Sequence, residues 1–419
     1  MRVLVFEQFY SGHYFTYIEH LLPRLSDLVS EVVVAITKPA IESEHFKVTL
    51  GKHRALRNVQ FEGCVPPADG SLPTRERFAL LRNLRDAISH TKPDYVLVPS
   101  ADGPTLAMGI LGHAGITLLP KGIPSEATLH YGYGPAVVTA RHFLKETAYR
   151  MAYSGCSWTH LNFVNFLFFE YAIAHRWRWT KRVRLVPDPV PKAPRLTKTE
   201  ARKLLNVPQE GRYIGFLGLL DPRKAVPELL AAFRAAKLGE SDRLLLAGQM
   251  DPAFRALIAD DYNDLLKNER LIVIDRHLTE AELIQGYGAL DLVCVANRPP
   301  GLSSLMLKGV AAGRPIISHD FGWSSALVRR FDLGKVADVF DTEKFAQTLR
   351  NAVDASADYR ESEATRRLLA FHDISNFTET MLDNVRSAVG KPQEQPLRVW
   401  DWVLQALEPE YHNVLTENS

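Results

Sequence analysis

The chain of 419 residues is long for one domain and comfortable for two, and its 46% hydrophobic and 23% charged residues are ordinary for a globular protein. A formal net charge of +2 gives no basic footprint, which excludes a general nucleic-acid-binding protein. No run of about 18 apolar residues is present to cross a membrane, and the N-terminus leads into a strand rather than an apolar signal core.

The three cysteines indicate the redox compartment. Cys64, Cys156 and Cys294 are odd in number and far apart, and their spacing does not match that of metal ligands. Such thiols are typical of a reducing compartment, where disulfides rarely form. We therefore expect a cytoplasmic protein with reduced cysteines.

The first half of the chain alternates short apolar runs with helical patterns, which is typical of an α/β domain. Strands are predicted at residues 2–6, 31–36, 59–61, 95–99, 116–119 and 158–162. Helices are predicted after the loop that ends at Gly12, and at residues 74–89, 106–111 and 137–153.

Candidate site residues in this half follow predicted strands, because open α/β sheets bind ligands at the carboxyl ends of their strands. Gly12 and His13 follow the first strand, and Asp102 follows the strand at residues 95–99. His130 lies in a predicted loop over residues 120–134 that is long enough to indicate a function. We treat Asp102 and His130 as candidate catalytic residues. His13 becomes a third candidate only through the family resemblance described below, and a surface or capping role is its alternative.

A basic and aromatic segment runs from Arg176 to Arg184. It combines five basic side chains with Trp177 and Trp179, a composition that suits the anionic surface of a membrane. The alternative is a solvated loop whose tryptophans pack against their own domain. The absence of an amphipathic period in the segment favours this second interpretation.

Four prolines between Pro187 and Pro194 exclude a helix or a central strand, so they predict a linker between two domains. Beyond it, strands are predicted at residues 213–220, 243–247, 271–274, 292–296, 314–318 and 335–340. Helices are predicted from residue 199 and at residues 226–237, 252–267, 279–287, 325–331, 377–389 and 399–407. A capping box is predicted at Thr279 and Glu282. This regular alternation indicates a parallel, doubly wound sheet.

Residues 297–320, which read NRPPGLSSLMLKGVAAGRPIISHD, connect two of these strands. A Gly/Ser loop leads into a short apolar helix that begins after Ser303. Gly313 follows the helix, where a left-handed residue is usual. The free N–H groups at the start of such a helix can bind an anion. The alternative is an ordinary strand–helix–strand unit that binds no ligand.

This segment resembles the signature of glycosyltransferase family 4, the retaining nucleotide-sugar enzymes of the GT-B fold. Its tail GVAAGRPII matches the family pattern, and residues 303–305 stand where the family's loop wraps the donor diphosphate. The family's two acidic positions fall on Pro300 and Lys308. By the resemblance, the lost acids would have bound the donor sugar and the nucleotide ribose, and Lys308 can donate to a ribose hydroxyl but cannot accept from one.

Residues 218–225, GLLDPRKA, resemble the family's second motif, G-R-L-x-x-x-K-G. Lys224 matches the lysine that binds the donor diphosphate, and Arg223 adds a second charge beside it. Leu219 stands at the family's arginine position, and Ala225 stands at its final glycine. The alternative is an exposed basic helix start, but a helix N-terminus disfavours cations, so two adjacent cations there need another reason.

The resemblance implies a GT-B fold, with two Rossmann-like doubly wound domains facing a central cleft. Residues 1–190 would be the acceptor domain, residues 191–375 the donor domain, and residues 376–419 a helical extension that packs back on the first domain. It also implies sugar transfer from a UDP- or GDP-linked donor to an acceptor, with retention and without a metal or another cofactor. The implied donor-binding residues are Gly12, Gly218, Arg223, Lys224, Gly301, Leu302, Ser303, Ser304, Leu305 and Lys308.

Two alternatives stay open. The first is a catalytically silent relative that binds a nucleotide or a partner protein, which the residues Pro300, Lys308 and Leu219 favour. The second is a different GT-B chemistry such as nucleotide-sugar epimerisation, which needs an acid and a base in the cleft. In either case we expect a cytoplasmic location, with contact to the inner face of a membrane if the basic and aromatic segment binds lipid.

Overall fold

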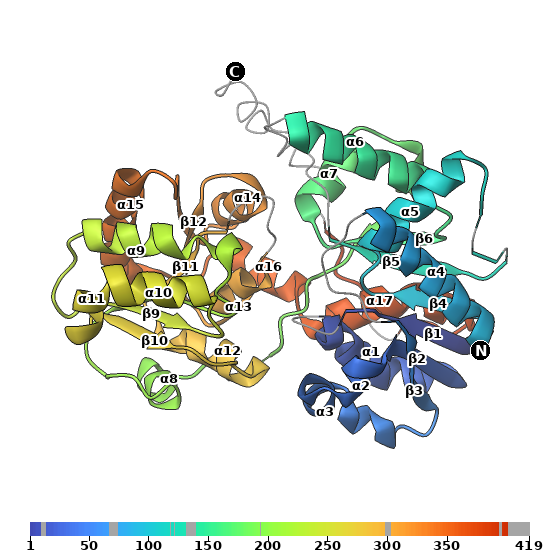
Figure 1. Cartoon of the computed structure of the whole chain (residues 1–419), viewed down its shortest axis with the longest axis horizontal. Coiled ribbons are helices and arrows are strands. Elements are labelled where there is room, and N and C mark those ends of the chain that lie inside the picture. Colours follow the sequence, from blue (N-terminus) through green and yellow to red (C-terminus); the bar gives the residue numbers. More distant parts are fainter. Residues whose placement is uncertain are drawn as a thin grey trace. The chain divides into compact units, whose positions relative to one another are not determined.

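The computed structural model describes residues 1–9, 14–66, 74–117, 119–120, 122–130, 140–192, 194–297, 303–393 and 396–400. The chain divides into two compact units (Figure 1). Unit 1 comprises Met1–Pro189 together with the chain from Ile374 onward, and unit 2 comprises Val190–Asp373. Each unit is built on one parallel sheet, which confirms the predicted class of two doubly wound α/β domains.

A seven-stranded parallel sheet forms the centre of unit 1, in the order β3-β2-β1-β4-β5-β6-β7. Its strands are β1 (Arg2–Phe6), β2 (Glu31–Thr37), β3 (Val59–Val65), β4 (Tyr95–Val98), β5 (Ser125–Leu129), β6 (His160–Phe163) and β7 (Val183–Leu185). Its helices are α1 (Tyr14–Leu28), α2 (Lys38–Glu42), α3 (Glu44–Thr49), α4 (Thr74–Thr91), α5 (Asp102–His113), α6 (Ala140–Gly155), α7 (Phe166–Ala174) and α17 (Ile374–Ala388).

The strand predicted at residues 116–119 is wrong, and the sheet uses β5 in its place. Ile116 is exposed and Leu119 is buried, but neither lies in a strand. β5 is hard to recognise because the carboxylate of Glu126 is buried in the middle of it. Tyr95 and Asn162 bind this carboxylate from the neighbouring strands, at 3.0 and 2.6 Å. A buried acid that is fully hydrogen-bonded breaks the apolar pattern without breaking the strand.

Helix α17 completes the core of unit 1 after the chain has left unit 2. The ring of Phe377 is fully buried and lies 5.1 Å from that of Tyr17 on α1. Arg184 on β7 donates to the carbonyl oxygen of Thr380 and to the carboxylate of Asp383, at 2.6 and 2.7 Å. The last described helix therefore belongs to the same packing unit as the first strand.

Unit 2 has a six-stranded parallel sheet in the order β10-β9-β8-β11-β12-β13. Its strands are β8 (Tyr213–Leu217), β9 (Arg243–Ala247), β10 (Leu271–Ile274), β11 (Leu292–Val295), β12 (Ile316–His319) and β13 (Gly334–Ala337). Its helices are α8 (Lys198–Leu204), α9 (Val226–Ala235), α10 (Pro252–Asp261), α11 (Asn263–Lys267), α12 (Glu280–Gly286), α13 (Ser304–Ala311), α14 (Gly322–Arg330), α15 (Thr342–Ala355) and α16 (Glu363–Phe371).

The predicted elements of unit 2 need few corrections. The capping box of Thr279 and Glu282 is confirmed, with both reciprocal bonds formed. The helix predicted at residues 252–267 is broken at Tyr262, whose φ of −127° is not helical. Helices α15 and α16 were not predicted, because both sequences carry many polar residues. The predicted helix at residues 399–407 lies outside the described residues except for 399 and 400, which are not helical.

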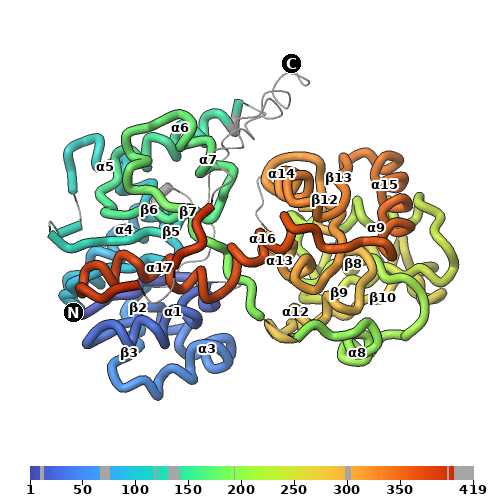
Figure 2. Tube along the Cα trace, turned by 180° about the vertical axis from the view of Figure 1, so that it is seen from behind, coloured from blue at the N-terminus to red at the C-terminus, as the bar shows by residue number. Residues whose placement is uncertain are grey.

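Two passages of the chain run side by side at the boundary of unit 2. The backbone N–H of Val190 donates to the carbonyl oxygen of His372 at 2.8 Å, and Val190 forms a parallel bridge with Asp373. Lys192 also pairs with the carboxylate of Asp373 at 2.9 Å. The outgoing proline-rich segment and the returning segment between α16 and α17 (Figure 2) are thus bonded to each other.

The packing of α17 predicts a large loss of stability when its central ring is removed. Phe377→Ala should lower the free energy of unfolding by about 3–5 kcal/mol, because it deletes a fully buried ring from a core shared with α1. Urea denaturation measures the change. The matched control is Phe143→Ala on α6, whose side chain is 59% exposed and whose loss should cost less than about 1 kcal/mol. Equal losses of unfolding free energy in the two variants would contradict the packing of Phe377 against α1.

Candidate functional site

The two stretches of unit 2 with predicted donor-binding residues reach the same edge of its sheet. β8 and β11 are neighbours, yet the chain leaves β8 towards β9 on one side and β11 towards β12 on the other. The carboxyl ends of such a strand pair form the crevice where open α/β sheets bind ligands. Gly218 follows β8, and Ser303 immediately precedes α13. The fold therefore places both stretches at the switch point of unit 2.

Gly218 brings the backbone after β8 against the first turn of α13. Its φ is +132°, and a Cβ atom there would lie 2.5 Å from Cδ1 of Leu305. A Cβ atom on Gly248, after β9, would in turn lie 1.9 Å from the carbonyl oxygen of Gly218. Neither position has room for a side chain. The structure thus joins two of the predicted residues, Gly218 and Leu305, by direct packing.

The start of α13 has polar groups without partners. Ser303 is the N-cap residue, but its side chain makes no capping hydrogen bond. Its hydroxyl oxygen and Oδ1 of Asn297 are both buried and lack a hydrogen-bond partner in the described part of the chain. The first N–H groups of a helix also have no partner within the helix. The Ser303 hydroxyl and the first backbone N–H groups of α13 are therefore available donors, whereas Oδ1 of Asn297, which follows β11, can only accept. The predicted Gly301 and Leu302 lie outside the described residues.

Arg223 and Lys224 occupy one short turn, Pro222–Lys224, but differ in their surroundings. Arg223 is exposed and binds both carboxylate oxygens of Asp221, with Nε at 3.1 Å from each. Burial would raise the pKa of Asp221, but the hydrogen bonds from Arg223 outweigh it and hold that pKa below its usual value. The ammonium nitrogen of Lys224 lies 5.8 Å from the centre of the Phe216 ring.

Lys224 is the more available cation of the two. Among the described residues, no carboxylate lies within 4.0 Å of its ammonium nitrogen. Burial lowers the pKa of Lys224 to about 8, while the nearby charge of Asp221 opposes this shift. Ala225, at the position of the family glycine, has a left-handed backbone with φ of +50°. The turn thus keeps the conformation of a glycine although the glycine itself is replaced.

Lys308 does not point freely into the site. Its side chain is buried, and its ammonium nitrogen lies 2.6 Å from the carboxylate oxygen Oε1 of Glu280, the first residue of α12. Sequence reasoning missed Glu280, because it recognised the Thr279–Glu282 capping box and attached no function to the residue between them. Only packing of α12 on α13 reveals the partner.

Unit 1 brings together Asp102 and His130, which are 28 residues apart in sequence. Asp102 begins α5 after β4, and His130 directly follows β5 rather than lying in a long loop. The Asp102 carboxylate accepts from the backbone N–H of His130 at 3.1 Å and lies 3.2 Å from Nδ1 of its ring. The ring of Tyr17 lies 5.9 Å from that of His130. Gly12 and His13 lie outside the described residues.

Glu7 is a further polar residue at the sheet edge of unit 1 that the sequence did not single out. It follows β1, which together with β4 forms the switch point of that sheet. Its Oε1 accepts from the backbone N–H groups of Gln8 and Phe9, both at 2.9 Å, while Oε2 is buried without a partner in the described residues. Burial raises the pKa of Glu7 to about 8, although these two hydrogen bonds oppose the shift.

One group of side chains in the described residues has ligand atoms close enough together for a metal ion. These atoms of His319, Asp320 and Asp338 lie within 4.8 Å of one another, after β12 and β13. Nδ1 of His319 already lies 3.2 Å from the Asp320 carboxylate and 3.4 Å from the carbonyl oxygen of Ala337. The chemistry derived below does not use this group, and transfer without a metal stays a prediction.

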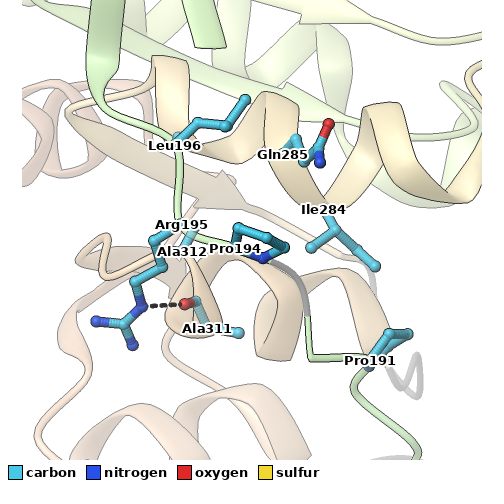
Figure 3. A pocket seen from close by; sticks show the side chains of 9 residues that line it. Pro191, Pro194, Arg195, Leu196, Ile284, Gln285, Ala311 and Ala312 are labelled. Carbon is cyan, nitrogen blue, oxygen red and sulfur yellow. Dashed lines mark hydrogen bonds between the residues drawn. The ribbon is translucent and has the colours of Figure 1, made fainter. Parts of the chain in front are cut away.

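A small hollow lies at the far end of α13 from Ser303. Figure 3 shows Arg195 beside it, with its Nε donating to the carbonyl oxygen of Ala311 at 2.7 Å. A cation in this position satisfies the C-terminal end of the helix and its dipole. Ile284 and Pro194 supply apolar lining. The hollow is therefore distinct from the switch point.

The basic and aromatic segment is largely used in packing. Trp179 is buried, with its ring 6.3 Å from that of Phe168. Arg182 donates to three backbone carbonyl oxygens, including that of Trp158 at 2.6 Å, and Arg150 stacks 4.2 Å over the ring of Trp177. These contacts favour the interpretation in which the tryptophans pack on their own domain. Within the described residues, no helix has the length and apolar character needed to span a bilayer. Membrane contact stays a prediction.

Comparison with known proteins connects unit 2 with glycosyl transfer. Residues 211–355 match the family model described as Glycosyl transferases group 1. The D-inositol 3-phosphate glycosyltransferase of Mycolicibacterium smegmatis is 28% identical over 181 residues, which are 42% of this chain and 39% of that protein. The chain thus spans about two fifths of the length of the curated relatives it matches.

Solved structures agree with the fold over nearly the whole chain. HepE of Anabaena, in a complex with UDP-glucose, has a TM-score of 0.64 and 14% identity, over 92% of this chain and all of that one. A sucrose-phosphate synthase of Thermosynechococcus elongatus has a TM-score of 0.67 and 16% identity, over 93% of this chain and 99% of its own. These similarities confirm the predicted GT-B fold.

Glu7 predicts a pH dependence of stability. Because burial raises its pKa to about 8 in the folded state, the folded protein binds a proton that the unfolded chain, with a pKa of 4.5, releases. The free energy of unfolding should therefore fall as the pH rises from about 4.5 to about 8, by up to about 1.4 kcal/mol for each pH unit. Glu7→Gln should remove this decline, and urea denaturation across the window measures it.

The matched control for Glu7 is Glu44→Gln, a carboxylate that is 78% exposed on α3. Its pH dependence should run parallel to that of the unchanged protein. If Glu7→Gln also runs parallel to the unchanged protein, Glu7 is ionised in the folded state and the assignment is wrong.

Proposed function

We propose that the protein transfers a sugar from a nucleotide-sugar donor to a hydroxyl group of an acceptor, and that unit 2 binds the donor diphosphate. Two groups carry this proposal: the Lys224 ammonium, which has no close carboxylate in the described residues, and the first turn of α13, where the buried Ser303 hydroxyl makes no capping hydrogen bond. Both lie at the switch-point edge of a domain that matches Glycosyl transferases group 1. Gly218 holds the two segments together by its packing on Leu305.

The chemistry follows from the charge that develops. In the transfer, the bond between the anomeric carbon and the phosphate oxygen breaks, and the nucleoside diphosphate leaves with an additional negative charge. The Lys224 ammonium, the N–H groups of residues 303–305 and the Ser303 hydroxyl would stabilise that charge. Arg223 would contribute less, because Asp221 already neutralises it. On this proposal the transfer needs no metal, because these groups would offset the charge of the leaving diphosphate.

The acceptor side is assigned to unit 1. An imidazole held by a carboxylate is suited to take the proton of an acceptor hydroxyl as the new bond forms, and Asp102 and His130 provide this arrangement. For the donor, a UDP-linked sugar is favoured over a GDP-linked one, because HepE has the same fold and was solved with UDP-glucose. Retention of configuration follows from the resemblance to family 4. The proposed donor-binding residues also include Gly12, Gly301 and Leu302. His13 stays a candidate catalytic residue.

A catalytically silent nucleotide-binding protein is the second candidate. The observation in its favour is the change at three positions of the two motifs. Leu219, at the position of the family arginine, is 51% exposed and offers no charge. Lys308, at an acidic position, is already paired with Glu280. Pro300, at the other acidic position, cannot ionise. Measured sugar transfer or donor hydrolysis distinguishes the two candidates.

Loss of Lys224 should weaken nucleotide binding. Lys224→Ala removes a charge-assisted contact to the diphosphate, which is worth about 1.5–3 kcal/mol, so the affinity for UDP should fall about 10- to 150-fold. Calorimetric titration with UDP, GDP and ADP measures the change. Lys267→Ala, an exposed lysine at the end of α11, is the control and should bind as the unchanged protein does. Unaffected binding by Lys224→Ala would place the nucleotide elsewhere.

The pKa of Lys224 also predicts how nucleotide affinity depends on pH. Because this pKa is about 8 before binding, the ammonium is charged below that value and becomes neutral above it. The affinity for UDP should therefore decline as the pH rises through about 8. Lys224→Arg keeps its charge throughout this range and should show a flatter profile. Identical profiles for the two proteins would mean that Lys224 does not face the diphosphate.

A further inference from the structure

We infer that Glu280 binds the ribose hydroxyl groups of the nucleotide, so that a residue of α12, held in place by Lys308 of α13, selects a ribonucleotide. This inference rests on the proposed function, because it requires a nucleotide at the switch point of unit 2. It assigns a ligand contact to a residue that lies outside both recognised motifs.

The carboxylate of Glu280 is paired with Lys308 but is not enclosed by the protein. Lys308 is 8% exposed, and its ammonium nitrogen lies 2.6 Å from Oε1 of Glu280. The side chain of Glu280 itself remains 40% exposed. The buried lysine thus holds Oε1 by an ion pair, while part of the Glu280 side chain stays accessible to solvent. A carboxylate offers about four lone-pair sites, and Lys308 uses only part of them.

The position of the pair directs this carboxylate towards the diphosphate site. Lys308 lies in the second turn of α13, and helical side chains lean towards the N-terminus, so its ammonium group extends back towards Ser303. Glu280 is the first residue of α12, which packs against α13. Both helices follow strands of the same parallel sheet, β10 and β11. Their first residues therefore lie at the same carboxyl edge.

Charge decides which part of a nucleotide Glu280 can contact. A carboxylate repels a phosphate group, so it does not bind the diphosphate directly. It accepts hydrogen bonds from hydroxyl groups, and the ribose carries two neighbouring hydroxyls close to the diphosphate. Lys308 can only donate. Because Lys308 neutralises Glu280, the pair adds little net repulsion at a site that must attract an anion.

The competing explanation is an ion pair with a purely structural role, since a buried ammonium group needs a counter-charge. The two explanations differ in what they predict for a mutant. A structural pair affects stability but treats all nucleotides alike. A ribose contact makes the protein discriminate UDP from 2′,3′-dideoxy-UDP, and this discrimination depends on residue 280.

Calorimetric titration with UDP, 2′,3′-dideoxy-UDP and inorganic pyrophosphate tests the inference, with GDP and its dideoxy form in their place if GDP binds more tightly. The unchanged protein should prefer UDP to the dideoxy form by about tenfold or more. Glu280→Ala should abolish this preference and leave the affinity for pyrophosphate unchanged. Glu280→Gln, which keeps the size of the side chain, should lose most of the preference even if the alanine variant is unstable.

The matched control is Glu282→Gln, on the same turn of α12. Glu282 binds Arg276 and Thr279, so this change should lower the melting temperature without altering the preference for UDP. If the unchanged protein does not discriminate, or if both variants of Glu280 keep the full preference, the inference is wrong while the proposed function stands. If the unchanged protein binds none of the ligands, the proposed function itself is contradicted, and with it the inference that rests on it.

Discussion

Gly218 and Leu305 lie so close together that the end of β8 and the start of α13 form one structural element. Gly248 adds the end of β9 to this contact, since its backbone packs on the carbonyl oxygen of Gly218. The three segments come from separate parts of the chain, and close approach of their backbones holds them in register. The shape of the switch point therefore depends on glycine positions and on the partly buried Leu305 rather than on the charged residues that surround them.

This constraint explains how the chain keeps the fold while its charged residues change. Ala225 adopts the left-handed conformation at a position where the resembling family has glycine, so the turn that carries Lys224 is preserved. Lys308 stands at a position where the resembling family has an acid, and Glu280 on the adjacent helix carries the opposite charge.

Sequence reasoning recovered the scaffold well where the strands are apolar, as in β8, β9 and β11. It failed at β5, because Glu126 is buried there and satisfied by Tyr95 and Asn162 from other strands. For the candidate site, Gly218, Lys224 and Ser303 could be named because two short stretches of the sequence resemble the motifs of a known family. Glu280 and Glu7 could not, because their significance depends on packing and burial that no local pattern records. The pairing of Asp102 with His130 likewise required the three-dimensional fold.

The position of α17 has a consequence for synthesis of the protein. Because α17 follows unit 2 in the chain, the ribosome completes Val190–Asp373 before it produces the helix that covers α1. Unit 2 has all its strands at that moment, whereas the apolar face of α1 around Tyr17 still lacks Phe377. Unit 1 therefore completes its core only after unit 2 has been synthesised, although all seven strands of its sheet precede unit 2 in the chain. Until then, the face of α1 that packs on α17 lacks its partner.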